Sequence, residues 1–371
     1  MSKHQKKVSS VSLHRRVLGF DGLRAAAFLM VFISHKAPAP WTDALGSAGV
    51  WLFFVLSGFL IARILARSRD EIEAGTSSFS MALKAFYLRR TARITPVYYV
   101  FLTVLSVLAL RRLVDLGEED RQLANWFYLA NIYIEWHGWR TDLGHLWSLA
   151  VEEQFYLAFA PLALLLPRRH FAKLCLCLIG VSVLAHVFLW VRGAWIVSFD
   201  VDTAANLGLL ALGGLAGLWA ECPLPRRLAN DAAIVLVLTA LVALPLGVAD
   251  TGLWPVVGRP SGLLMALLLV QIIQCQYSRI VRLLEISWIR EIGLISYGAY
   301  LFHPVIHADR LLPLVGIHIQ LRHSVMMVIE LSITLVLAEL SWRLLERPVR
   351  ALLRSNRVAH AGTCGADLQI R

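Results

Sequence analysis

Long apolar stretches separated by short polar ones follow one another along the whole chain. Many of the apolar runs approach the roughly 20 residues that an α-helix needs to cross the hydrocarbon core of a bilayer. Because lipid offers no hydrogen bonds to a backbone, repeated runs of this length predict an all-α, polytopic membrane helix bundle. The ten expected transmembrane helices are Leu18–Lys36, Gly49–Ala66, Ile94–Leu110, Leu146–Leu166, Leu174–Val191, Thr203–Ala220, Asp231–Val248, Ser261–Tyr277, Glu291–Pro313 and Ser324–Leu345.

One further apolar run, Leu123–Ile134, has only 12 residues. This length is too short for a spanning helix, so we expect the run to be interfacial or re-entrant. With this choice both termini are cytoplasmic, and most of the 36 Lys and Arg residues fall on cytoplasmic segments, as the positive-inside rule requires. If the run did cross, most of the C-terminal positive charges would lie outside.

The composition agrees with a membrane protein. Hydrophobic residues make up 58% of the 371 residues and charged residues only 16%, unlike a soluble domain. The formal charge of +11 marks the ends of apolar runs and forms no single patch, so the expected partner is the lipid bilayer and not nucleic acid. The five cysteines lack metal-like spacing, and no metal is expected. The expected divisions are a basic cytoplasmic N-terminus (1–17), a membrane domain (18–350) and a short cytoplasmic tail (351–371).

The first expected span carries two ionisable residues, Arg24 and His35. They are separated by ten residues, which places them about 16 Å apart along a helix axis. Ionisable groups inside a membrane span are costly and by default mark a functional site. The alternative is that Arg24 extends to the interface and His35 merely ends the helix.

The fourth expected span carries polar residues on one face. Ser148, Glu152 and Tyr156 are spaced four residues apart, and His145 leans towards the same side. Glu153 follows Glu152 directly and is rotated by about 100° from it. Acidic residues early in a helix also favour its dipole, but these two lie deeper than the first turn. We therefore expect them to act in the site.

Basic residues precede the third expected span. Arg90 and Arg93 are three residues apart and share a helix face, with Lys84 just before them. This geometry suits the binding of phosphate groups. For an isolated pair of this kind, plain positive-inside anchoring is the favoured explanation.

Another histidine, His303, lies in the outer half of the ninth expected span. Pro304 follows it, so a locally kinked helix with freed carbonyls is an equally good account of the pair.

Six segments in order resemble the acyltransferase 3 family, whose members are integral membrane enzymes that O-acylate sugars and related exported molecules. The resemblance extends from about residue 18 to residue 350. The matching segments are FDGLRAAAFLMVFISH, GVWLFFVLSGFLIARIL, FYLRRTARITPVYY, HLWSLAVEEQFYL, ISYGAYLFHPV and WRLLERPVR.

The resemblance implies roles for these residues. Arg24 and His35 match the family's Arg-x10-His motif, with His35 essential to catalysis. Further matches are Arg90 and Arg93 to its Arg-x-x-Arg motif, and Trp147, Ser148, Leu149, Glu152 and Tyr156 to its WSLxxExxxY motif. Trp51, where many members have Asp, and Asp200–Asn206, which matches loosely, depart from the pattern in ways that bear on the acceptor. No hydrolase-like domain follows the last span, so the membrane domain is expected to complete the transfer alone.

The expected activity is therefore O-acyl transfer, most simply O-acetylation. Acetyl-CoA or another acyl-CoA would act as donor substrate, with no permanently bound cofactor, and Arg90, Arg93 and Lys84 would bind its nucleotide. His35 would act as general base or take the acyl group itself, oriented by Glu152 or Glu153. The candidates for substrate or oxyanion contacts are Tyr156, Ser148, His145 and His303.

The expected acceptor is a hydroxyl of an exported or cell-surface carbohydrate or glycolipid, of exopolysaccharide, O-antigen or lipo-chitooligosaccharide type. The expected location is the bacterial inner membrane. A transporter or flippase for a sugar-containing molecule is the alternative, because buried His and Glu also serve proton relays and helices broken near Pro96 or Pro304 form substrate sites in carriers. The chain shows no two similar halves, as most such carriers do.

Overall fold

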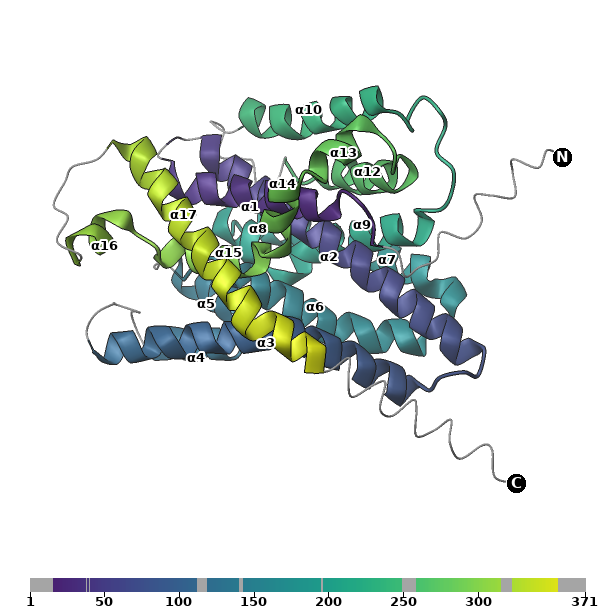
Figure 1. The fold of residues 1–371 in the computed structure, drawn as a ribbon. Coiled ribbons are helices and arrows are strands. Elements are labelled where there is room, and N and C mark those ends of the chain that lie inside the picture. Colours follow the sequence, from purple (N-terminus) through teal and green to yellow (C-terminus); the bar gives the residue numbers. More distant parts are fainter. Residues whose placement is uncertain are drawn as a thin grey trace, which may run out of the picture.

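The computed structural model describes residues 16–37, 39, 41–111, 119–139, 143–194, 196–248, 258–314 and 322–352. Within these residues the chain forms helices and no strands, which confirms the all-α class (Figure 1). Most of the expected N-terminal segment and of the expected C-terminal tail lies outside the described residues.

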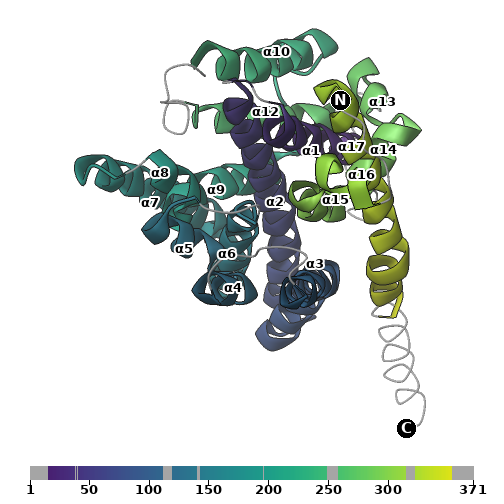
Figure 2. The same cartoon turned by 90° about the vertical axis from the view of Figure 1, so that its left-hand side faces the viewer.

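The long helix α2 (Trp41–Glu73) runs through the middle of the molecule (Figure 2). It packs along α1 (Phe20–Lys36) and α9 (Thr203–Trp219). Glycines allow α2 and α9 to touch, because a Cβ on Gly58 would lie 1.8 Å from the Leu210 carbonyl oxygen and one on Gly213 would lie 2.0 Å from that of Val55. Small residues at such crossings are a common way for membrane helices to associate closely.

Two further long helices complete the walls around α2. α3 (Phe79–Leu110) starts at Ser78, whose hydroxyl accepts from the Met81 amide, and α6 (Leu146–Leu165) lies against both α2 and α3. The remaining helices are α4 (Glu119–Trp126), α5 (Ala130–His137), η2 (Arg168–His170), α7 (Phe171–Val191), α8 (Ile196–Val201), α10 (Asp231–Val248), α12 (Ser261–Gln274), α13 (Arg279–Leu284), α14 (Ser287–Leu294), α15 (Ser296–Phe302), η4 (His303–Val305), α16 (Ala308–Leu314), α17 (His323–Ser341) and the π-helical η5 (Trp342–Glu346).

Five helices of the described residues are long and apolar enough to cross a membrane. They are α2, α3, α6, the helical stretch Arg168–Val191 and the stretch His323–Leu352. Three shorter helices, α9, α10 and α12, are also apolar. The chain is thus built as a multi-pass membrane protein, while ten spans with cytoplasmic termini stay a prediction. The short run Leu123–Ile134 falls on α4 and α5, which have eight residues each and are about 12 Å long, in agreement with a segment that does not cross.

The ninth expected span, Glu291–Pro313, is wrong as a single helix. The chain divides it among α14, α15 and η4, followed by α16. At the first break the Ser296 hydroxyl donates to the Gly293 carbonyl (2.8 Å) and replaces a backbone donor. At the second, Pro304 has no N–H to continue an α-helix. α14 packs closely against α1 at Gly293. A side chain there would not fit, because its Cβ would lie 1.8 Å from the Asp21 carbonyl oxygen.

Candidate active site

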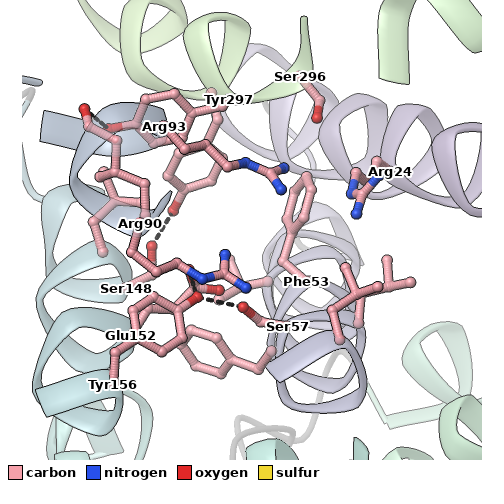
Figure 3. A pocket seen from close by; sticks show the side chains of 17 residues that line it. Arg24, Phe53, Ser57, Arg90, Arg93, Ser148, Glu152, Tyr156, Ser296 and Tyr297 are labelled. Carbon is pink, nitrogen blue, oxygen red and sulfur yellow. Dashed lines mark hydrogen bonds between the residues drawn. The ribbon is translucent and has the colours of Figure 1, made fainter. Parts of the chain in front are cut away.

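Five helices enclose a pocket in the middle of the bundle (Figure 3). Its walls come from α1, α2, α3, α6 and α15, and the space between them, including the part open to solvent, is about 710 Å³. Three guanidinium groups reach into it, from Arg24 on α1 and from Arg90 and Arg93 on α3. We call it the arginine pocket. It is lined by Arg24, Val50, Phe53, Phe54, Leu56, Ser57, Leu60, Arg90, Arg93, Ile94, Ser148, Leu149, Glu152, Tyr156, Ser296, Tyr297 and Tyr300.

The three arginines concentrate positive charge in a largely apolar enclosure. Arg24 is partly neutralised by Asp21, with 2.5 Å between Nη1 and Oδ1. The Arg90 guanidinium lies over the Tyr156 ring, 4.9 Å from its centroid, as a cation–π pair. Glu152 in the same wall offsets one of these charges, and the remaining positive charges repel each other unless an anion binds between them. The pocket is therefore suited to an anionic ligand such as a phosphate group.

Glu152 lines this pocket and is hydrogen-bonded to Tyr156. The Tyr156 hydroxyl donates to Glu152 Oε2 (2.8 Å) and is also hydrogen-bonded to the Ser57 hydroxyl. Because the single tyrosine hydrogen goes to the carboxylate, Ser57 is the donor in the second bond. The network fixes the ring on which Arg90 rests, so Ser57, Tyr156 and Glu152 together position the cation.

The face predicted for α6 is the one that lines the pocket. Ser148, Glu152 and Tyr156 all contribute to its wall, whereas Glu153 is half buried and does not line it. The 100° rotation between neighbouring helical residues separates the two carboxylates as expected.

A second cluster lies at the other end of the site. His35 Nδ1 is 2.7 Å from His303 Nε2, and His303 Nδ1 is 2.8 Å from the Tyr300 carbonyl oxygen. The ring of His145, at the N-terminal end of α6, lies 5.7 Å from that of His303, centroid to centroid. We call His35, His145, Tyr300 and His303 the histidine cluster. His303 is fully buried, while His35 is exposed.

Tyr300 and Ser148 connect the two regions. Both line the arginine pocket, and their hydroxyls are 2.6 Å apart. The Tyr300 hydroxyl also donates to the His145 carbonyl (3.2 Å), and His145 Nε2 donates to that of Leu301 (3.2 Å). The pocket therefore extends from the three arginines to the hydroxyls of Ser148 and Tyr300, and Tyr300 is a member of the histidine cluster.

The expected contact between a glutamate and His35 is not formed. The hydrogen-bond partner that the described residues give His35 is His303, and Glu152 pairs with Tyr156. Depth explains the difference. Glu152 lies seven residues along α6 from His145, which is about 10 Å along the helix axis, and His145 is the residue of α6 that lies beside His303.

Lys84 is the other site residue that the structure does not bring in. It is exposed on α3 and does not line the arginine pocket, although Arg90 and Arg93 do. Six residues separate Lys84 from Arg90 by position, which is about 9 Å of helix. In this structure its ammonium stays at the surface.

A buried ion pair beside His35 was missed by the sequence interpretation. Lys36 Nζ is 3.0 Å from Glu330 Oε2 and donates to the Ile306 carbonyl (2.6 Å). Their side chains are only 6% and 10% exposed, so the pair ties α1 to α17 and to the segment after η4. His307 and Asp309 bring ligand atoms within 4.8 Å of Glu330, but the Lys36 ammonium already neutralises that carboxylate. A basic residue at the end of an apolar run gives no sign of this role.

The chain is similar in sequence to a known family of proteins. The family model "Acyltransferase domain" matches residues 17–315. Peptidoglycan O-acetyltransferase OatA of Listeria monocytogenes is 29% identical over 90% of this chain and 56% of its own length. YrhL of Bacillus subtilis, for which the name proposes the same activity, is 31% identical over 91% of this chain and 55% of its own length. No solved structure matches the chain.

The chain belongs to the acyltransferase 3 family, because the family model covers most of its length. The order of motifs predicted this membership, and it is confirmed. The chain spans little more than half the length of the curated relatives it matches.

Proposed function

We propose that this protein is a membrane O-acetyltransferase that moves an acyl group from acyl-CoA to a hydroxyl of a cell-envelope carbohydrate. The observation that carries the proposal is the continuity of the site. Three arginines line one part of a pocket whose other part is formed by Ser148 and Tyr300, and Tyr300 leads directly to His303 and His35.

In this proposal the arginine pocket takes the phosphate-bearing end of acetyl-CoA from the cytoplasm. Arg90 and Arg93 provide charge-assisted hydrogen bonds to the phosphates, and Arg24 adds to the positive field. Ser57, Tyr156 and Glu152 hold Arg90 in place. The pantetheine arm is narrow and flexible and extends past Ser148 towards the histidine cluster, about 16 Å from Arg24 along α1.

At the histidine cluster, His35 acts as general base. It takes the proton of the acceptor hydroxyl while the hydroxyl oxygen attacks the carbonyl carbon of the thioester. The tetrahedral intermediate then loses its C–S bond, and the CoA thiolate takes the proton back from His35. The hydroxyls of Ser148 and Tyr300 are the candidate donors to the oxyanion, and each would turn its hydrogen from the neutral His145 carbonyl to the substrate. Tyr156 is a poorer candidate than expected, because its hydrogen is used by Glu152.

The acceptor we propose is a glycan at the outer face of the bacterial inner membrane. Two of the relatives are named for peptidoglycan O-acetylation, and an exopolysaccharide, an O-antigen or a lipo-chitooligosaccharide offers the same chemistry, a sugar hydroxyl. His35 is exposed, as a base that meets a bulky acceptor must be.

The test uses the full chain in lipid nanodiscs with acetyl-labelled acetyl-CoA. An O-acetyltransferase releases CoA thiol and transfers label when a peptidoglycan fragment or an extracted envelope glycan is added. Exported glycans from cells with and without the gene, compared by mass spectrometry, identify the acceptor. If acetyl-CoA binds but neither CoA release nor labelled glycan appears with any envelope glycan, the proposal is wrong. Transport of the glycan without acetylation would favour a carrier.

A further inference from the structure

We propose that His303 is a positioning residue that sets the tautomer of His35, in the place where many enzymes use a carboxylate. The inference rests on the proposed function, since it assigns the atom of His35 that acts as base. It starts from two hydrogen bonds in line, from the Tyr300 carbonyl through His303 to His35.

The direction of these bonds follows from the carbonyl. A carbonyl oxygen can only accept, so His303 Nδ1 carries a hydrogen and donates it to Tyr300. In a neutral imidazole the second nitrogen is then an acceptor, so His303 Nε2 presents a lone pair to His35 Nδ1. His35 Nδ1 must therefore carry its hydrogen, and His35 Nε2 is left with a free lone pair.

The geometry suits this bond. The planes of the two imidazoles lie within 9° of each other, with centroids 4.9 Å apart and 2.7 Å between the facing nitrogens. The rings thus meet edge to edge, and the N–H and the lone pair lie in their common plane.

The surroundings of His303 favour the neutral ring. Its side chain is fully buried, and the rings of Phe28 and Phe32 pack against it at centroid distances of 6.0 and 6.3 Å. A buried imidazolium needs a negative partner. The contacts found on the described residues around His303 are instead aromatic rings, two other imidazoles and a carbonyl.

The consequence for the reaction concerns His35. With Nδ1–H held by His303, the lone pair of Nε2 points away from His303, and the residue as a whole is exposed. When Nε2 takes the proton of the acceptor hydroxyl, the His303 lone pair remains on the Nδ1 hydrogen and stabilises the imidazolium. The role is that of the carboxylate in a catalytic triad, performed by a neutral group.

Three variants separate this role from packing. In His303→Gln the amide oxygen lies near the position of the lost Nε2 and accepts from His35. In His303→Asn the shorter amide reaches Tyr300 but not His35, and His303→Leu reaches neither. We expect kcat to stay within about tenfold of the parent for Gln and to fall about a hundredfold or more for Asn and Leu. KM for acetyl-CoA should not change, because the arginine pocket is untouched.

The matched control is His186→Leu. His186 is a half-buried histidine of α7, with Nδ1 2.7 Å from the Ser182 carbonyl, and it belongs to neither the arginine pocket nor the histidine cluster. Its loss should leave kcat unchanged. Equal activity of the Asn and Gln variants, or a His303→Leu variant with parental kcat, would overturn the proposal.

A second measurement needs no turnover. Nitrogen NMR of 15N-histidine protein in nanodiscs, with the His35 signals assigned by their loss in His35→Gln, reports which ring nitrogen carries hydrogen. We expect His35 protonated on Nδ1 in the parent and shifted towards Nε2 in His303→Leu. Protonation on Nε2 in the parent refutes the tautomer assignment even if the enzyme is active. If the parent releases no CoA at all, the proposed function fails, and the spectrum still decides the tautomer.

Discussion

The arginine pocket and the histidine cluster differ in the charge of the groups that form them. The pocket gathers full charges, from three arginines and Glu152, and holds them through rings and hydroxyls. The cluster is built from imidazoles, a carbonyl and a hydroxyl. The charges of Lys36 and Glu330 lie nearby, but they pair with each other. A charged ligand is best held by opposite charge, whereas a base needs a neutral lone pair whose direction is fixed. This contrast is the basis on which we propose donor binding for the arginine pocket and proton transfer for the histidine cluster.

The largest effect should come from the histidine cluster. His35→Ala removes the proposed base, and we expect acyl transfer to fall by about 10²- to 10⁴-fold. The variant should still insert and should still bind acetyl-CoA, because its arginines are intact. Labelled product and CoA release measure the loss, and equilibrium binding of acetyl-CoA is the control. Near-parental transfer by His35→Ala would contradict the proposal that the histidine cluster performs the proton transfer.

The arginine pocket should respond in KM. Arg90→Ala or Arg93→Ala removes a charge-assisted hydrogen bond of about 1.5–3 kcal/mol. The KM for acetyl-CoA should therefore rise about ten- to a hundredfold, whereas kcat should stay unchanged. Lys84→Ala is the matched control, because Lys84 is on the same helix but outside the pocket. Loss of activity that excess donor cannot restore would indicate a structural role for the arginines.

The two adjacent glutamates give a smaller and sharper test. Glu152→Gln keeps the size and removes the charge beside Tyr156 and Arg90, whereas Glu153 lies outside the pocket. We expect the first substitution to lower activity more than Glu153→Gln, by at least the roughly tenfold that 1.4 kcal/mol represents. Since Glu152 belongs to the donor pocket, the loss should appear mainly in KM for acetyl-CoA. A larger effect from Glu153→Gln would mean that α6 presents its other side to the substrates.

The smallest effect should come from Ser57→Ala. The substitution removes one hydrogen bond to Tyr156 and leaves Glu152 in place. A single hydrogen bond of this kind contributes about 1 kcal/mol, so kcat/KM should fall about fivefold. Steady-state kinetics at varied acetyl-CoA measure the change. A loss as large as that of Arg90→Ala would show that Ser57 contacts the donor itself.

The periodicity of apolar residues predicted the all-α class, and the motifs predicted many of the residues that line the arginine pocket. Spacing along one helix is enough to place Ser148, Glu152 and Tyr156 on one face, because helix geometry is local. The same spacing puts Arg24 and His35 at different depths. Each of these features depends on residues within one element.

The pairing of His35 could not be predicted in this way. Which side chain meets it depends on how deeply α6 enters relative to α1, and on the break that places η4 beside α1. The break depends on Ser296 and Pro304, and its consequence is a contact between residues 268 positions apart. Local patterns indicated that His303 and Glu152 were both inside the membrane domain, and tertiary packing decided between them.

The proline in the third long helix has a mechanical consequence. Pro96 cannot donate to the carbonyl four residues before it, so α3 lacks one bond of its ladder three residues beyond Arg93. About a third of the most apolar stretch of α3 is buried, against 72% for α2. Arg90 and Arg93 are thus carried by the less buried of these two helices, close to the turn that lacks a hydrogen bond. If the proposed donor binds here, we expect a bulky nucleotide to enter by bending of α3 at Pro96, against an α2 that packs closely on α9 at Gly58 and Gly213.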